Sequence, residues 1–264
     1  MRNRLHKLLP IVILVVGAIV GLNIKPLPVT SMVLANAAIT RPSPPSLVFI
    51  LAGQSNMLGR GKPLSAGLSS DVRLFVWRDK WKVAADPLGY WKDKNNGIGP
   101  GMAFGLNLLS HFDPGITVGL IQCAKGGSEI SAWRTGAAPF RACANQVAAS
   151  RATVAGVLFL QGESEARSMS GSTGWAAGFQ MVLTSFRDRY GASLPFLLGQ
   201  IGTLIDRPYQ QQVRDAQAAA AASNSGITLV ITTDLPVQPD GVHFTVGAYH
   251  DVGTRFATAW FTRI

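Results

Sequence analysis

The sequence predicts an α/β protein in which a mostly parallel sheet lies between two layers of helices, a three-layer α/β/α sandwich. Two features lead to this prediction. Five short runs are almost continuously apolar, which is typical of strands that are buried on both faces. Longer segments with helical character separate these runs. Such alternation of strands and helices favours a parallel sheet that is covered on both sides.

The expected elements follow one another in regular order along the chain. Pro100 is suited to the start of a helix, where its missing N–H costs nothing. The run AQAAAAAS fits a later helix because alanine has the highest helix propensity. The segment VRLFVW, residues 72–77, is a candidate extra strand. The expected strands are 46–53, 116–124, 155–162, 194–202 and 226–233, and the expected helices are 102–111, 139–150, 175–190, 209–223 and 245–261.

The N-terminal residues carry the features of an export signal. Three basic residues among the first seven precede an apolar run at 8–22. This run has the length of a signal-peptide core and is short for a bilayer span. Ala-Asn-Ala at 35–37 is a candidate cleavage site. We therefore expect residues 1–37 to be a signal peptide, with an uncleaved N-terminal membrane anchor as the alternative. Both predict an extracytoplasmic protein, secreted or periplasmic.

The remainder of the chain is expected to form a short linker and one domain. Residues 38–46 include the run RPSPPS, and successive prolines favour a stiff, extended segment. Residues 47–264 are long enough for one domain with a sizeable core. The formal net charge is +10, but five of the 24 basic residues lie in residues 1–41, and the others are scattered. This distribution does not predict a nucleic-acid partner.

The cysteines and histidines do not predict a metal site. Cys123 and Cys143 have a spacing that fits no common zinc pattern. They could form one disulfide after export or remain two free thiols, and both alternatives stay open. His243 and His250 could share a helical face, but two imidazoles without a third ligand make a poor metal site. The sequence also lacks a nucleotide-binding glycine loop. We expect no metal.

Polar residues and glycines gather where three of the expected strands end. GQSNM (53–57), CAKGGSEI (123–130) and QGESEA (161–166) each follow an apolar run. Ligands of parallel α/β sheets bind beyond the carboxyl ends of the strands, so these segments should meet at one edge. Ser55 in the first segment is either a turn residue or a nucleophile.

A serine nucleophile requires a base and a group that orients the base. In PDGVHFT, Asp240 precedes His243 by three residues. Such a turn can bring the carboxylate to Nδ1 of the imidazole and leave Nε2 free to take the proton of Ser55. Alternatively, Asp240 is a turn residue and His243 a surface group at a helix start. His6 lies in the export segment and His111 ends an expected helix.

Acyl transfer also requires hydrogen-bond donors for the oxyanion. The pair Gly126-Gly127 can present a backbone N–H, because glycine adopts conformations that other residues avoid. Gln161, at the end of an expected strand, could donate from its side-chain amide, and Glu163 follows it. A plain turn and a polar strand cap are the alternatives. Aromatic residues that could stack on sugars or pack in the core are Trp77, Trp81, Tyr90, Trp91 and Trp133.

Taken in order, the segments GQSNMLGRG, GIGPGMAFG, CAKGGSEISAW, LFLQGESEA and DGVHFTVGAYHDVGTRFA resemble the SGNH/GDSL-type hydrolases. Among these the chain is most similar to carbohydrate esterase family 6 and the sialate O-acetylesterase-like group, over about residues 46–261. The resemblance implies a flavodoxin-like sheet, removal of acetyl groups from carbohydrates, and no cofactor. One difference is Glu165, where an aspartate is more usual, and this change could alter substrate contacts.

The resemblance also implies roles for individual residues. Ser55 would be the nucleophile, His243 the base and Asp240 the acid that orients it. The implied oxyanion donors are the backbone of Ser55, Gly127 and Gln161, and the implied supporting residues are Gln54 and Glu163.

The sequence therefore predicts an exported serine esterase that removes O-acetyl groups from a carbohydrate, of the acetylxylan or sialate type, through an acyl-enzyme. A lipase, thioesterase or general esterase of the same fold is one alternative. A non-catalytic carbohydrate-binding protein is the other. The sequence selects neither a particular acetylated glycan nor an oligomeric state.

Overall fold

The computed structural model describes residues 43–89 and 95–263. The predicted signal peptide or anchor, most of the predicted linker, and the aromatic residues Tyr90 and Trp91 lie outside the described residues. Within the described part of the chain, none of the helices combines the length and apolar character that a membrane span requires.

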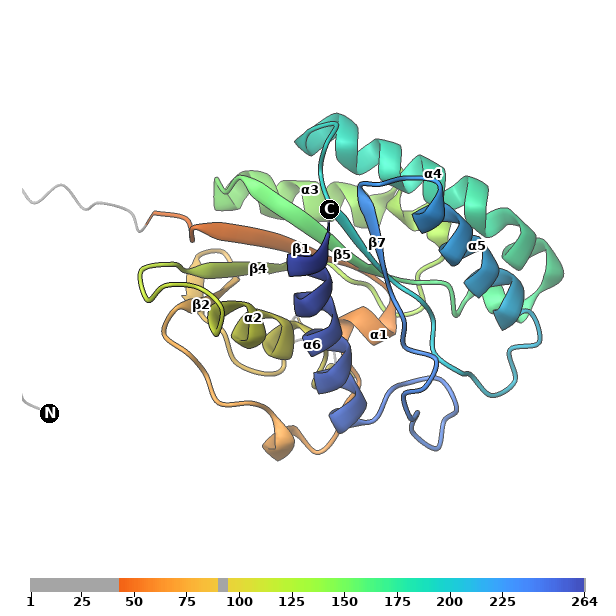
Figure 1. Ribbon diagram of the computed structural model, residues 1–264, viewed down its shortest axis with the longest axis horizontal. Helices are drawn as coiled ribbons and strands as arrows, with labels where there is room; N and C mark the ends of the chain where they lie inside the picture. The colour runs from red at the N-terminus through yellow and green to blue at the C-terminus, as the bar shows by residue number, and fades with distance from the viewer. Residues whose placement is uncertain (1–42, 90–94, 264) are drawn as a thin grey trace, which may run out of the picture. The chain divides into compact units, whose positions relative to one another are not determined.

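The described residues form one seven-stranded sheet with the order β3-β2-β4-β1-β5-β6-β7 (Figure 1). Neighbouring strands are parallel, except that β2 and β3 form an antiparallel pair. The strands are β1 (Leu47–Gly53), β2 (Leu74–Trp77), β3 (Trp81–Val83), β4 (Val118–Gln122), β5 (Val154–Leu160), β6 (Phe196–Gly199) and β7 (Ile227–Val230). The first strand in the chain thus occupies the centre of the sheet.

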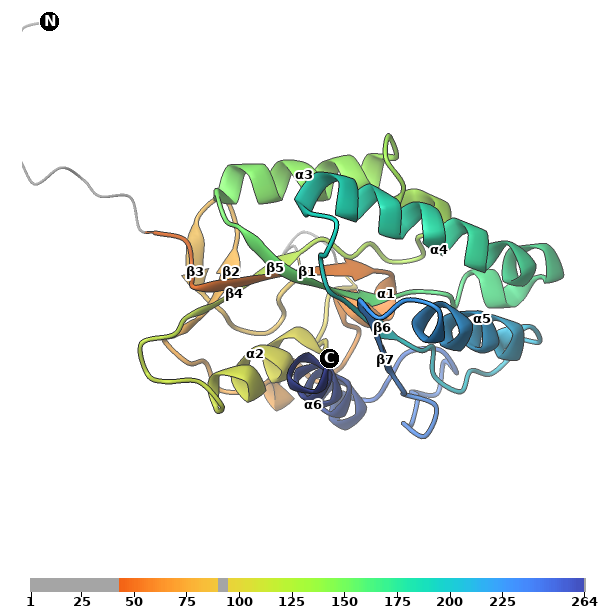
Figure 2. The same cartoon turned by 45° about the horizontal axis from the view of Figure 1, so that its top comes forward.

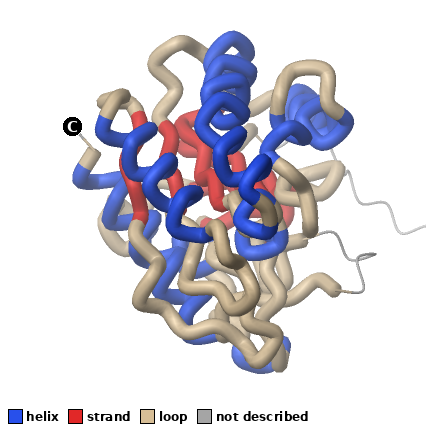
Figure 3. Tube along the Cα trace, turned by 90° about the vertical axis from the view of Figure 1, so that its right-hand side faces the viewer, coloured by secondary structure: helices blue, strands red, loops and turns tan. Residues whose placement is uncertain are grey.

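Helices cover both faces of this sheet, which confirms the predicted α/β/α class. Helices α3, α4 and α5 lie on one face, and α2 and α6 lie on the other (Figure 2). Figure 3 shows the strands crossing the middle of the molecule with helices on both sides. The helices are α1 (Ser55–Leu58), α2 (Gly101–Leu109), α3 (Ala138–Ser150), α4 (Met169–Tyr190), α5 (Gln210–Ala222) and α6 (Val246–Thr262), with short 3₁₀ turns η1 (Leu64–Ala66), η2 (Ile130–Trp133) and η3 (Glu165–Arg167).

The apolar runs serve two hydrophobic cores, one on each side of the sheet. Because side chains alternate along a strand, Phe49 and Leu51 pack toward α2 and α6, whereas Val48, Ile50 and Ala52 pack toward α3 and α4. All five side chains are buried. This two-sided burial explains why the strand has no polar alternation in the sequence.

The structure differs from the prediction at several places, among them the unexpected short helix α1, strand β3 and the start of α4. Strand β3 was not expected, because WKV is short and its side chains are partly or fully exposed. Helix α4 begins at Met169 rather than near residue 175. Its first turn, MSGSTG, has a low helix propensity, but the Ser168 side chain caps it by accepting a hydrogen bond from Gly171 N.

The two cysteines form a disulfide. Cys123 follows β4 directly, and Cys143 lies within α3. Of the two alternatives that the sequence left open, the structure therefore contains the bridge. It ties the start of the loop that carries Gly126 and Gly127 to the helix layer.

Candidate active site

Ser55 lies at the carboxyl end of the central strand, immediately after a turn that requires glycine. Gly53 has φ +129°, and a Cβ at this position would lie 2.0 Å from the backbone oxygen of Leu160. Only glycine therefore allows the chain to leave β1 so close to β5. Helix α1 begins at Ser55, a residue that is 6% exposed. The hydroxyl is thus held by rigid backbone at the edge predicted for ligand binding.

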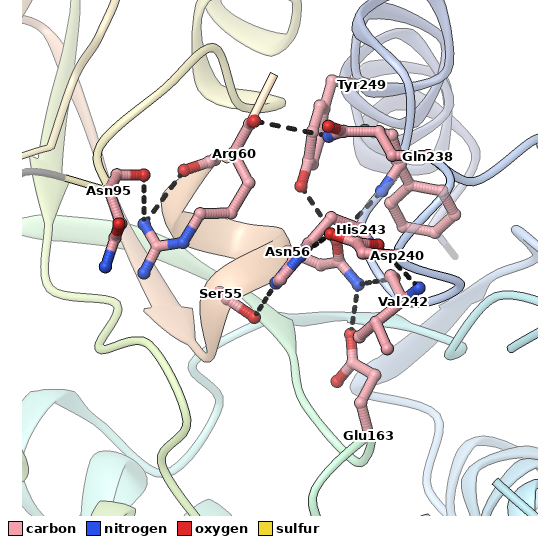
Figure 4. A network of polar contacts seen from close by, with 12 residues as sticks. Ser55, Asn56, Arg60, Asn95, Glu163, Gln238, Asp240, Val242, His243 and Tyr249 are labelled. Carbon is pink, nitrogen blue, oxygen red and sulfur yellow. Dashed lines mark hydrogen bonds and ion pairs between the residues drawn. The ribbon is translucent and has the colours of Figure 1, made fainter. Parts of the chain in front are cut away.

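Asp240 and His243 lie in the connection between β7 and α6. Asp240 Oδ1 accepts hydrogen bonds from the backbone N–H groups of Val242 and His243, both at 2.9 Å. Its Oδ2 lies 2.7 Å from His243 Nδ1, and His243 Nε2 lies 2.9 Å from Ser55 Oγ (Figure 4). The structure thus brings the three predicted residues together in the order acid, imidazole and hydroxyl.

Hydrogen bonds keep Asp240 ionised. Partial burial by itself raises the pKa of this carboxyl, but the bonds from the two backbone N–H groups and from the His243 ring outweigh burial and lower it below its usual value. A carboxylate at this position favours the tautomer in which Nδ1 of His243 carries the proton. Nε2 is then the acceptor for the hydroxyl of Ser55.

Two residues that line this site have backbone N–H groups without an internal partner. Among the described residues, no hydrogen bond occupies the N–H of Ser55 or that of Gly127. Gly127 has φ +68°, a conformation that favours glycine, and lines the same pocket as Ser55 and His243. The two N–H groups are therefore available to an oxygen anion formed next to Ser55.

The structure does not bring Gln161 to this pocket. The side chain is fully buried, and its Nε2 donates to Glu165 Oε2, to Ser128 O at 3.2 Å and to Gln54 Oε1 at 3.3 Å. Its Oε1 accepts a bond from Trp175 Nε1 at 3.0 Å. Since its amide is already engaged in the interior, the oxyanion role expected for Gln161 does not fit this geometry.

The alternation of side chains along β5 explains why Gln161 faces the interior. Val157 and Phe159 point toward the α3 and α4 layer, and side chains two residues apart point to the same side of a strand. Gln161 therefore follows them into the interior instead of turning to the pocket. Glu165 is also buried and accepts a bond from Ile130 N at 2.6 Å. It orders the interior and does not line the Ser55 pocket, so the substrate contact considered for it is absent there.

Gln54 lines the Ser55 pocket, as expected for a supporting residue. Its Oε1 lies 3.4 Å from Gly162 N and 3.3 Å from Ser164 N, which ties Gln54 to the loop after β5. Glu163 in the same loop is 1% exposed and accepts a bond from Asn56 Nδ2 at 2.6 Å. Burial raises the pKa of Glu163 to about 7.

Asn56 is one of the residues of this site that sequence reasoning missed. Its side chain is fully buried and makes hydrogen bonds to four groups: Glu163, the backbone of Val242, the backbone of Phe244, and the hydroxyl of Tyr249 (Figure 4). Its position directly after Ser55 was the only available signal. Its partners lie 107 to 193 residues away along the chain.

The pocket around Ser55 has a volume of about 250 Å³ and is rich in arginine. It is lined by Gln54, Ser55, Arg60, Gly127, Glu163, Ser164, Arg167, Arg207, Asp240, Val242 and His243.

Within residues 43–89 and 95–263, no cluster of three or more histidine, cysteine, aspartate or glutamate side chains is arranged to hold a metal ion. Of the aromatic candidates, Trp133 is fully buried in the core, whereas Trp77 and Trp81 are half-buried.

Comparison with known families agrees with this architecture. The family described as "Carbohydrate esterase, sialic acid-specific acetylesterase" matches residues 45–262, nearly the whole described part of the chain. The chain belongs to this family. As a family member with this site, the protein is a carboxylic ester hydrolase, and the predicted resemblance is confirmed.

Individual relatives of this carbohydrate esterase agree with the family assignment or share the fold. A probable carbohydrate esterase of Arabidopsis thaliana, At4g34215, is 29% identical over 248 residues, which cover 85% of this chain and 94% of the relative. The X-ray structure of the Arabidopsis thaliana protein AT4G34215 has a TM-score of 0.76 at 26% identity and covers 83% of this chain and 99% of that one. The structure of NanS shares the fold, with a TM-score of 0.65 at 16% identity, covering 83% and 98% of the two chains.

Proposed function

We propose that this esterase removes O-acetyl groups from a carbohydrate through an acyl-enzyme on Ser55. The observation that carries the proposal is the distance of 2.9 Å between Ser55 Oγ and His243 Nε2, with Asp240 bound to the other ring nitrogen. His243 Nε2 takes the hydroxyl proton while Oγ attacks the acetyl carbonyl. The tetrahedral oxyanion is bound by the N–H groups of Ser55 and Gly127.

Collapse of this intermediate releases the sugar hydroxyl, which receives the proton from His243. The acetyl group then remains on Ser55 Oγ. Water attacks the acetyl carbonyl, His243 takes the proton of that water, and acetate leaves when the proton returns to Ser55 Oγ. Asp240 stabilises the imidazolium in both halves of the reaction and stays ionised throughout.

The test is hydrolysis of p-nitrophenyl acetate by Ser55→Ala and His243→Ala, with Ser70→Ala as the matched control, because Ser70 is exposed and lies outside the pocket. We expect kcat to fall by about 10³-fold or more in the first two variants and to stay unchanged in the control. Full activity in Ser55→Ala would overturn the nucleophile. Faster cleavage of long-chain esters than of acetyl esters would favour a lipase or thioesterase. Glycan binding without hydrolysis would favour a carbohydrate-binding protein.

The charge of the pocket favours an acidic sugar over neutral acetylxylan as the substrate. Arg167 and Arg207 line the pocket, and neither forms an ion pair with a carboxylate of the described residues. Burial and the neighbouring charge of Arg167 lower the pKa of Arg207, although the charges of Asp206 and Glu163 act in the opposite direction. A substrate carboxylate between them would relieve this repulsion.

This preference predicts a higher kcat/KM for an O-acetylated sialic acid than for an acetylated xylo-oligosaccharide. Arg207→Gln should lower kcat/KM for the acidic sugar by about tenfold, the loss of one charge-assisted contact, and leave the neutral substrate unchanged. Arg189→Gln, on an exposed part of α4, is the charge-matched control. An equal loss on both substrates would remove the assignment of an acidic sugar.

We also propose that the esterase is exported. The basic start, the apolar run at 8–22 and the disulfide between Cys123 and Cys143 support this location. N-terminal sequencing of the protein from culture medium or periplasm should begin near residue 38. Recovery of the full-length chain in the membrane fraction would instead establish the anchor.

A further inference from the structure

A second cavity lies at the same edge of the sheet, next to the Ser55 pocket. It has a volume of about 450 Å³ and is larger than the Ser55 pocket. Its walls come from the ends of β2 and β4, from the β2–β3 turn and from α3. The mechanism described above leaves this cavity unused.

A single loop separates the two cavities. Gly126 lines the second cavity, and the next residue, Gly127, lines the Ser55 pocket. A Cβ at Gly126 would lie 4.0 Å from the Ser55 Cβ and 2.4 Å from a terminal nitrogen of Arg60. Gly126, with the guanidinium of Arg60 beside it, therefore lies between the nucleophile and the second cavity. The two cavities are therefore close enough to contact neighbouring parts of one extended ligand.

One side of the second cavity is suited to a sugar ring. Trp77 at the end of β2 is half-buried and packs edge-to-face against Trp81, with ring centroids 5.3 Å apart. Leu58 and Leu88 add buried apolar surface. Sugar sites combine an aromatic or apolar wall with polar groups that fix orientation. Gln146 of α3 supplies such a group, because its half-buried amide has no partner among the described residues.

The charge of this cavity is positive. Arg78, Lys82 and Lys125 line it, against the single carboxylate of Asp79. Lys82 and Lys125 are exposed and form no ion pair within the described part of the chain. The buried Nε of Arg78 has no partner either. A cavity with this excess of unpaired cations attracts anionic ligands.

We propose that the substrate is a chain of carboxylate-bearing sugars, with the acetylated residue at Ser55 and a neighbouring residue in the second cavity. This inference rests on the proposed function and extends it from a single acidic sugar to an oligosaccharide. Two cationic cavities on either side of one loop match a polymer that carries an anion on each residue. A single acidic monosaccharide would occupy only the Ser55 pocket.

The kinetic test compares substrates of different length. The probes are O-acetylated galacturonic acid and sialic acid, each as the monosaccharide and as a short oligosaccharide. We expect a lower KM for the oligosaccharides. The double variant Lys82→Gln/Lys125→Gln should raise that KM about tenfold, leave kcat within twofold, and leave the monosaccharides and p-nitrophenyl acetate unchanged. Lys80→Gln, in the β2–β3 turn next to Lys82 but outside the cavity, is the control. The length effect should shrink in 0.5–1 M salt (roughly a 3–4 Å screening length).

A binding measurement separates failure of this inference from failure of the proposed function. Ser55→Ala should bind the deacetylated acidic oligosaccharide more tightly than the monosaccharide, and Trp77→Ala added to it should abolish the difference. Equal KM and equal binding for both lengths would overturn the oligosaccharide subsite while leaving the esterase intact. Tight length-dependent binding without hydrolysis by the parent enzyme would uphold the subsite and overturn the esterase proposal. The galacturonate and sialate arms show which acidic sugar chain is preferred.

Discussion

Asn56 holds the backbone on both sides of His243. Its Nδ2 donates to the carbonyl of Val242 at 3.0 Å, and its Oδ1 accepts from the N–H of Phe244 at 3.2 Å. Because Asn56 directly follows Ser55, the residue next to the proposed nucleophile sets the position of the proposed base. The remaining positions of the amide are filled by Glu163 and Tyr249.

Asn56→Ala should therefore lower kcat for p-nitrophenyl acetate, because small displacements of an aligned base cost orders of magnitude in rate. We expect a loss of about 10²-fold with little change in KM. Tyr249→Phe removes one hydrogen bond to the same amide without breaking the contacts to the His243 backbone, so it should cost far less. Equal kcat values for Asn56→Ala and the parent, with folding verified by circular dichroism, would exclude this positioning role.

Gln161→Leu should act on stability more than on catalysis. The variant leaves Trp175 Nε1 and the Oε2 of Glu165 each without a buried partner, and each such loss costs about 1–3 kcal/mol. For a domain of this size we expect the Tm to fall by about 2–4 °C per kcal/mol. At 25 °C the folded variant should keep kcat within a few fold. A loss of about 10²-fold in kcat at unchanged Tm would instead support an oxyanion role for Gln161.

The buried Glu163 should make stability fall as the solution becomes more alkaline. Burial raises its pKa from 4.5 to about 7, so between these values the folded state binds more protons than the unfolded state. The stabilisation is complete below about pH 4.5 and is lost as the pH rises through 7. Glu163→Gln keeps an oxygen that accepts from Asn56 and removes this titration. Chemical denaturation from pH 4.5 to 8 should show a difference of up to about 3 kcal/mol in the pH dependence. Parallel curves for the two proteins would contradict the assignment.

Loss of the disulfide should destabilise the domain. Cys123 and Cys143 are 20 residues apart, and closing a loop of that size stabilises a fold by about 3 kcal/mol through the unfolded state. We expect Cys123→Ser/Cys143→Ser to lower the Tm by about 6–12 °C. Activity at 20 °C should fall as well, since Cys123 starts the loop that carries Gly127. Reduction of the parent protein should reproduce both effects, whereas the double variant should not respond to reductant.

Local sequence patterns were sufficient to predict most of the fold and part of the candidate site. Apolar runs of strand length predict buried parallel strands wherever they occur, so the layers and the edge that collects Ser55 and Gly127 could be inferred. Asp240 and His243 were predictable because only two intervening residues link them. The partners of Asn56 were not predictable, since a hydrogen bond across 186 residues leaves no local pattern.

For Gln161, the direction in which the side chain points could not be predicted from the sequence. Its position at a strand end was inferred correctly, but the side a strand-end residue faces depends on the register of the whole strand in the sheet. That register follows from packing against α4, which composition alone does not reveal. Similarly, α4 starts earlier than its propensities suggest because Ser168 supplies a cap.

The site is assembled from opposite ends of the domain. Ser55 follows the first strand, β1, and His243 lies just before the last helix, α6. While the chain emerges from the ribosome, the nucleophile is therefore present long before its base. Helix α6, which begins three residues after His243, packs against α2 and so anchors the segment that carries the base. The proposed group of Ser55, His243 and Asp240 is therefore complete only after α6 has been synthesised and has packed against the sheet.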